Sequence, residues 1–110
     1  MDKQFSQVAD RKTLEQLMER SNEQPVVLFK HSTTCPISAA AHREMSKVKP
    51  EVSIVVVQTA RDVSKAVAEL TGVRHESPQA FVVRNNKVAW TASHYDVTAE
   101  AVEEAVRASV

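Results

Sequence analysis

Runs of consecutive apolar residues alternate along this chain with segments in which apolar residues recur every three or four positions. Val26 to Phe29 and Ile54 to Val57 are continuous apolar runs, which is typical of strands buried on both faces of a sheet. Ala80 to Val83 and Val88 to Ala92 flank Asn85-Asn86. Because asparagine tolerates the positive φ angles of tight turns, this stretch predicts a β-hairpin.

Four segments between these runs have the spacing of amphipathic helices. Each begins near a residue suited to the first turn of a helix: Asp10, Pro36, Asp62 and Thr98. The second helix has an apolar stripe of Ile37, Ala41, Met45 and Val48, and a polar stripe of Ser38, His42, Ser46 and Lys49. Pro50 is expected to end that helix, and Gly72, the chain's single glycine, is expected to end the third helix in a left-handed conformation.

With a weaker strand at Phe5 to Val8, the predicted order is β-α-β-α-β-α-β-β-α over one domain, residues 1–110. A βαβ crossover between two buried strands implies a parallel central pair, and the closing hairpin adds antiparallel strands. The expected fold class is therefore α/β, with a mixed central sheet flanked by helices. This layout resembles the thioredoxin-like arrangement.

The charge balance and cysteine count narrow the function classes. Fourteen basic and fourteen acidic residues cancel, so we expect no general attraction to nucleic acid or to a membrane surface. The longest apolar runs are far shorter than the roughly 20 residues that span a bilayer, and the first residues lack an apolar signal core. A single cysteine precludes an internal disulfide and favours a reducing compartment, so we expect a cytoplasmic protein. One cysteine with scattered histidines is a poor zinc signature, and no metal site is expected.

Cys35 is the candidate nucleophile. It follows a buried strand and precedes Pro36, at the predicted N-terminus of a helix, where N–H groups and the helix dipole stabilise an anion such as a thiolate. Lys30 and His31 add to this effect if they turn toward the sulfur. An isolated Cys-Pro pair is more often inert than catalytic, but the succession of strand, cysteine-proline and amphipathic helix is much more specific.

Ser38 stands three residues after Cys35, in the place of the second cysteine of a C-x-x-C motif. Its hydroxyl can donate a hydrogen bond to the Cys35 thiolate, but it cannot resolve a mixed disulfide. The expected chemistry is therefore monothiol: Cys35 takes over a thiol adduct, and a second, external thiol releases it.

A later proline, Pro78, lies just before the first hairpin strand, after Ser77. It is either an ordinary loop breaker or a cis-proline beside the cysteine. We predict that the Ser77-Pro78 bond is cis, which leaves the backbone of Ser77 open to pair with an incoming thiol compound.

Five segments together resemble the monothiol bacilliredoxin family, from about Pro25 to the end of the chain: Phe29-Lys30-His31-Ser32, Thr34-Cys35-Pro36-Ile37-Ser38, His75-Glu76-Ser77-Pro78-Gln79, Trp90 and Ser93-His94. The resemblance implies a thiol-disulfide oxidoreductase that removes bacillithiol, a glucosaminyl-malate thiol, from proteins modified during oxidative stress. Its partners are then S-thiolated proteins and a low-molecular-weight thiol, with no bound cofactor.

The resemblance also assigns roles to individual residues. Cys35 becomes the attacking nucleophile, with Thr34 and Pro36 beside it in the motif. Ser77 and Pro78 flank a groove for the thiol compound. By position only, Ser93 and His94 fall where glutaredoxins contact their low-molecular-weight thiol.

Two other functions remain open. Monothiol proteins of similar fold hold an iron–sulfur cluster between two subunits, although Ile37 is expected to crowd one here. A redox-inert stress or scaffold protein is the other alternative. Trp90 is expected to pack on the hairpin and His42 to lie on a solvated helix face. His75 and Arg74 are either partners for the malate carboxylates or exposed loop charges.

Overall fold

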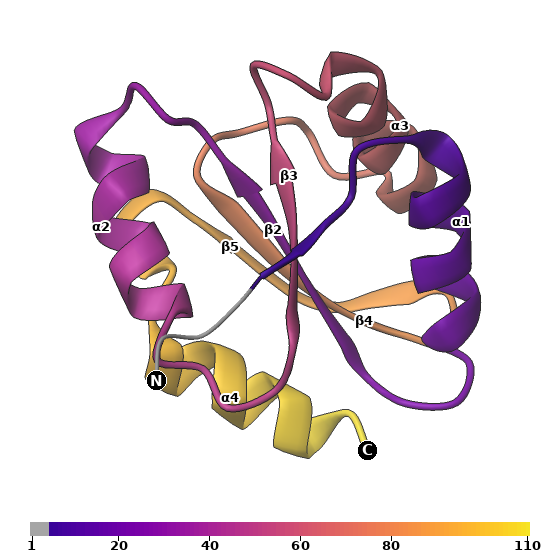
Figure 1. Ribbon diagram of the computed structural model, residues 1–110. Helices are drawn as coiled ribbons and strands as arrows, with labels where there is room; N and C mark the ends of the chain where they lie inside the picture. Colours follow the sequence, from indigo (N-terminus) through magenta and orange to yellow (C-terminus); the bar gives the residue numbers. More distant parts are fainter. Residues whose placement is uncertain (1–4) are drawn as a thin grey trace.

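A computed structural model describes residues 5–110, which form a mixed sheet covered by helices on both faces (Figure 1). The elements follow in the predicted order: β1 (Ser6–Gln7), α1 (Arg11–Arg20), β2 (Val26–His31), α2 (Pro36–Met45), β3 (Val52–Val56), α3 (Arg61–Thr71), β4 (Gln79–Arg84), β5 (Lys87–Ser93), a 3-10 turn η1 (His94–Asp96) and α4 (Ala99–Ala108). No helix within residues 5–110 is long and apolar enough to cross a membrane.

The sheet order is β1-β3-β2-β4-β5, which places β2 at the centre, between β3 and β4. β3 runs parallel to β1 and β2, whereas β4 is antiparallel to β2 and β5. The parallel central pair and the antiparallel hairpin are both as predicted. Asn85 and Asn86 have φ angles of 55° and 62°, so the hairpin turn also has the predicted left-handed conformation.

Two apolar layers separate the sheet from its helices. Figure 1 shows α1 and α3 together on one side of the sheet and α2 and α4 on the other. Alternate residues of β2 divide between the layers, because successive side chains of a strand point to opposite faces. Leu28 packs with α1 and α3, whereas Val27 and Phe29 pack with α2 and α4. All three side chains are buried.

The helix boundaries combine confirmed and wrong predictions. Asp10 caps α1 by accepting a 2.8 Å hydrogen bond from the Thr13 N–H, and Gly72 ends α3 with a φ of 70°, both as predicted. Asp62 is not the cap of α3, since Ala60 holds that position and is buried in the apolar layer beneath α1 and α3. This burial starts the helix two residues earlier and leaves Asp62 in its first turn, where the helix dipole favours a carboxylate.

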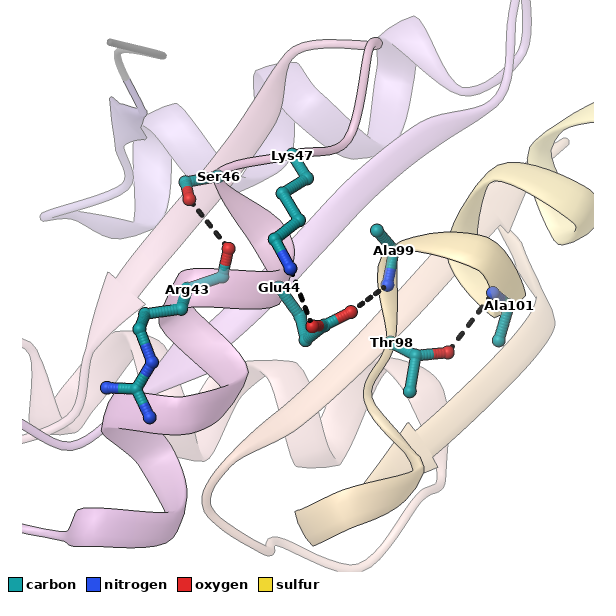
Figure 2. Close-up of polar contacts among 7 residues, drawn as sticks. All are labelled: Arg43, Glu44, Ser46, Lys47, Thr98, Ala99 and Ala101. Carbon is teal, nitrogen blue, oxygen red and sulfur yellow. Dashed lines mark hydrogen bonds and ion pairs between the residues drawn. The ribbon is translucent and has the colours of Figure 1, made fainter.

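The end of α2 also differs from the prediction. The helix stops at Met45, five residues before Pro50. The Ser46 hydroxyl donates to the Arg43 carbonyl at 2.7 Å (Figure 2). The Lys47 N–H donates to the Glu44 carbonyl, three residues back, at 3.0 Å. The final turn therefore tightens and the helical ladder ends.

Helices α2 and α4 are joined through Glu44. Its carboxylate accepts a 3.0 Å hydrogen bond from the Ala99 N–H at the start of α4 and a 3.1 Å ion pair from Lys47 (Figure 2). These donors lower the pKa of Glu44. Thr98 caps α4, as predicted, by accepting from the Ala101 N–H. The C-terminal end of α2, the helix that follows Cys35, is thus held by α4.

Candidate functional site

Four loops meet at one end of the sheet, and the strand register brings them there. Lys30 near the end of β2 pairs with Gln79 at the start of β4, and Gln79 pairs with Ser93 at the end of β5. His31 pairs with Val56 at the end of β3. Because neighbouring strands lie about 4.8 Å apart, the segments that contain Cys35, Ser77-Pro78 and Ser93-His94 emerge from adjacent strands.

Cys35 is the N-cap residue of α2, directly before its first helical residue. Its backbone is extended, with φ −106° and ψ 123°, and its carbonyl accepts the first helical hydrogen bond from the Ala39 N–H at 3.0 Å. Pro36 is the first helical residue, as predicted, and the first turn of α2 carries no acidic side chain. The half-buried thiol group therefore lies at a helix N-terminus with no neighbouring carboxylate in that turn, an arrangement that suits a thiolate.

Ser38 lies one turn into α2 and is fully buried. Its hydroxyl bonds to other partners than Cys35, with which a hydrogen bond was expected. Instead, Ser38 Oγ accepts from the Ser32 N–H at 2.9 Å and lies 2.9 Å from His31 Nδ1. These bonds tie the loop before Cys35 to the first turn of the helix.

His31 and His42 form a partly buried aromatic cluster under this loop. Their ring centroids are 4.7 Å apart, and His42 meets the ring of Phe5 edge-on, also at 4.7 Å. The expectation that His42 lies on a solvated face is therefore wrong. Burial lowers the pKa of both histidines, and the neighbouring His42 lowers that of His31 further. Both rings are therefore largely neutral at pH 7.

Gln58, just after β3, anchors the loop before Cys35 from the other side. Its amide nitrogen donates to Ser32 Oγ at 2.7 Å and to Thr34 Oγ1 at 3.2 Å, and its oxygen accepts from the Thr33 N–H at 3.3 Å. The exposed Thr34, next to Cys35, is held by this amide. The sequence reasoning missed Gln58, because a single polar residue after an apolar run is no signal by itself.

The Ser77-Pro78 peptide bond is cis, as predicted. Pro78 is buried, and its carbonyl accepts a 2.9 Å hydrogen bond from the His94 N–H. The structure thus brings the Ser93-His94 segment against the proline. Ser77 Oγ is buried and has no hydrogen-bond partner within residues 5–110. A buried hydroxyl left in this state is available to an incoming polar group.

Lys30 does not turn toward the sulfur. Its side chain is fully buried on the α3 side of the sheet, and its Nζ lies 3.0 Å from His75 Nδ1. Burial lowers the pKa of Lys30 to about 8. The pKa of His75 is lowered by burial and by the Lys30 charge, against a smaller raising effect of Glu76.

Trp90 is half-buried and packs against the apolar layer of α2 and α4, as expected for hairpin packing. It borders a groove of about 590 Å³ that contains Arg74 together with two acidic residues, Glu76 and Asp96. Arg74 and His75 therefore face different surroundings, although they are neighbours in the sequence. Within residues 5–110, no three His, Cys, Asp or Glu side chains gather in a group that could hold a metal ion.

Comparison with known proteins matches this arrangement to one family. The family model for monothiol bacilliredoxin BrxC matches residues 6–102. The chain belongs to the monothiol bacilliredoxin family. A solved structure described as a candidate oxidoreductase with a thioredoxin fold shares 34% sequence identity with this bacilliredoxin-family chain, covers 91% of each chain and superposes with a TM-score of 0.84.

More distant structures share the fold of this bacilliredoxin-family protein. Thioredoxin from Trypanosoma brucei brucei has 12% identity and a TM-score of 0.75, with coverage of 96% of this chain and 89% of that one. Malassezia sympodialis thioredoxin has 15% identity and a TM-score of 0.73, with coverage of 97% and 91%. The fold is therefore thioredoxin-like, and the family and fold together indicate a thiol redox role.

Proposed function

We propose that this protein is a cytoplasmic monothiol disulfide-exchange enzyme that removes bacillithiol from S-thiolated proteins through Cys35. The observation that carries the proposal is the pairing of Cys35, at the N-terminus of α2, with a buried serine at the resolving position. A helix N-terminus favours the thiolate, and Ser38 offers no second thiol.

The first step transfers the small thiol to Cys35. The Cys35 thiolate attacks the bacillithiol sulfur of the mixed disulfide, the sulfur–sulfur bond of the adduct breaks, and the target protein's thiolate leaves and takes a proton from water. A Cys35–bacillithiol disulfide remains. Because Ser38 cannot attack this disulfide, the intermediate persists until another thiol arrives.

The second step requires free bacillithiol as co-substrate. Its thiolate attacks the bacillithiol sulfur on Cys35, which releases the Cys35 thiolate and forms bacillithiol disulfide. The two electrons that reduce the target protein come from the two bacillithiol thiols, so no bound cofactor is needed.

The other site residues hold the small thiol during these steps. Thr34 and Pro36 border the nucleophile, and Ser77, with its unpartnered buried hydroxyl, borders Pro78. Ser93 and His94 form the other wall, since the His94 N–H is hydrogen-bonded to the Pro78 carbonyl. We assign these six residues to binding and Cys35 alone to bond formation.

A single-cysteine peptide carrying bacillithiol tests the proposal. In the presence of free bacillithiol, we expect wild-type protein to release the peptide thiol, and mass spectrometry to detect the Cys35–bacillithiol adduct when free thiol is withheld. Cys35→Ser should do neither. Release at an equal rate by Cys35→Ser, or no adduct on the wild-type protein, would overturn the proposal. Ser46→Ala, which removes an exposed hydroxyl at the other end of α2, serves as the control that should retain full activity.

A further inference from the structure

A second cavity, of about 450 Å³, opens beside α3 and outside the site residues named above. Three of its lining side chains are basic, Arg61, Lys65 and His75, and two are polar, Gln58 and Ser64. No carboxylate of the described residues, 5–110, lines it. This composition contrasts with the groove beside Trp90, where acidic residues offset Arg74.

The two strong charges of this cavity have no ion-pair partner among residues 5–110. Arg61 and Lys65 are four residues apart in α3, so their side chains share one helix face. Neither takes part in any of the ion pairs formed within residues 5–110. Two like charges at this spacing repel each other and slightly destabilise the helix. An anion bound between them replaces this repulsion with attraction.

The contact with Lys30 decides which ring nitrogen of His75 carries the proton and can donate a hydrogen bond. An ammonium group only donates, so the 3.0 Å contact from Lys30 Nζ makes His75 Nδ1 an acceptor. In the neutral ring, the proton then lies on Nε2, at the opposite edge of the imidazole. Ser64 Oγ, 3.3 Å from the same Nδ1, holds the ring in this orientation from α3.

Two of the lining residues connect the cavity to segments already described. Gln58 donates to Thr34, the residue immediately before Cys35. His75 precedes Ser77 by two residues. The cavity is therefore linked to the loop before Cys35 by a hydrogen bond and to the Ser77-Pro78 segment through the chain.

We propose that this cavity binds the carboxylates of the low-molecular-weight thiol, with Arg61 and Lys65 as cationic partners and His75 Nε2 as a donor. The identity of that thiol rests on the proposed function, since the malate portion of bacillithiol supplies two carboxylates. Lys30 acts as a positioning residue, because it sets the tautomer of His75 without lining the cavity. Arg74, beside Glu76 and Asp96, is not part of this subsite.

The kinetic test compares two adducts of one peptide, a mixed disulfide with bacillithiol and one with 2-mercaptoethanol, which has no carboxylate. The double variant Arg61→Ala/Lys65→Ala should lower the rate constant for the bacillithiol adduct about tenfold, which is about 1.4 kcal/mol. The rate for the 2-mercaptoethanol adduct should change less than twofold.

A matched control separates local binding from net charge. Lys12→Ala/Arg107→Ala removes two exposed cations from α1 and α4 and should leave both rates unchanged. An equal loss for both adducts, or the same loss in the control variant, would overturn the assignment of the cavity. Arg61→Lys should retain most of the wild-type rate for the bacillithiol adduct.

A binding measurement keeps this proposal separate from the proposed function. Reduced bacillithiol, added to Cys35→Ser, should shift the amide NMR signals of residues 58, 61, 65 and 75, and Arg61→Ala/Lys65→Ala should abolish those shifts. If Cys35→Ser shows these shifts but the wild-type protein transfers no bacillithiol, the subsite is supported and the proposed function is refuted. Efficient transfer without shifts at these residues would refute the subsite alone. Glutathione, which also bears carboxylates, should shift the same signals if the cavity recognises carboxylates in general.

Discussion

Replacing Lys30 with methionine should make the protein more stable at neutral pH. The Lys30 side chain is fully buried near the end of β2, with a hydrogen bond from Nζ to His75 and no carboxylate partner among residues 5–110. Burial lowers its pKa from the ordinary 10.5 to about 8, so at pH 7 the group is still charged in a place that disfavours charge. Methionine has a similar length and no charge, and it packs well in irregular apolar spaces.

The size of the effect follows from this pKa difference. A change from 10.5 to about 8 corresponds to a cost on the order of 3 kcal/mol for keeping the charge in the folded protein. Loss of the hydrogen bond to His75 reduces the gain in stability by roughly 1 kcal/mol. We therefore expect Lys30→Met to stabilise the fold by about 2 kcal/mol, or roughly 8 °C in Tm for a domain of this size.

The pH dependence distinguishes this mechanism from a simple packing gain. Between pH 8 and pH 10.5, the unfolded chain holds a proton on Lys30 that the folded chain has released, so wild-type stability rises with pH over this interval. Below pH 8 the cost of the buried charge is fully present. The advantage of Lys30→Met should therefore be greatest at pH 7 and should vanish near pH 10.5.

Urea unfolding at pH 7, 8.5 and 10 measures this difference, with the exposed Lys12→Met as the control that should follow the wild type. A Lys30→Met protein that is less stable than wild type at pH 7 would refute the reasoning, as would an advantage that stays constant up to pH 10. The same variant should transfer bacillithiol more slowly, because His75 loses the partner that sets its tautomer.

Three further predictions concern the residues beneath Cys35. Ser38→Ala leaves the partly buried Ser32 N–H without its partner and should lower stability by about 1 kcal/mol in urea unfolding, and an unchanged midpoint would show that water replaces the hydroxyl. Ser38→Cys places a second thiol one turn from Cys35 and should lose two hydrogens by mass spectrometry under mild oxidant, whereas two free thiols would contradict the helix start. His31, His42 and His75 have pKa values below the ordinary 6.5, so the unfolded chain binds more protons as the pH falls through this value, and stability should decrease between pH 7.5 and pH 5.5. Equal urea midpoints at these two pH values would contradict that assignment.

Backbone preferences predicted the parts of the fold that depend on one or two residues. Gly72 and Asn85-Asn86 adopt positive φ angles as expected, and Pro36 opens α2. The wrong boundaries have tertiary or side-chain causes that a local pattern does not contain. Burial of Ala60 moves the start of α3, and the Ser46 hydroxyl competes for a carbonyl that α2 needs to continue.

The sequence likewise predicted only part of the candidate site. The place of Cys35 directly before α2 and the cis bond at Pro78 follow from the motif and its spacing, and both are as predicted. The condition that Lys30 and His31 turn toward the sulfur is not met by Lys30, whose side chain is buried against His75. Neighbouring residues of a strand point to opposite faces, so the two side chains do not share one direction. The basic cavity depends on strand register, which places His75 against α3, and no sequence pattern shows that contact.

The number of hydrogen bonds that one hydroxyl makes explains why serine suits the resolving position. Ser38 Oγ has two lone pairs and one hydrogen, and one lone pair is used by the Ser32 N–H. If His31 Nδ1 is an acceptor, the hydrogen goes to His31 and none is left for Cys35. If Nδ1 carries a proton, it fills the second lone pair, and the hydroxyl hydrogen is free to reach the sulfur. The lowered pKa of His31 limits the protonated form near pH 7, so Ser38 stabilises the thiolate only when the neutral ring carries its proton on Nδ1. In every state, however, Ser38 accepts from the Ser32 N–H and so holds the loop before Cys35 against α2.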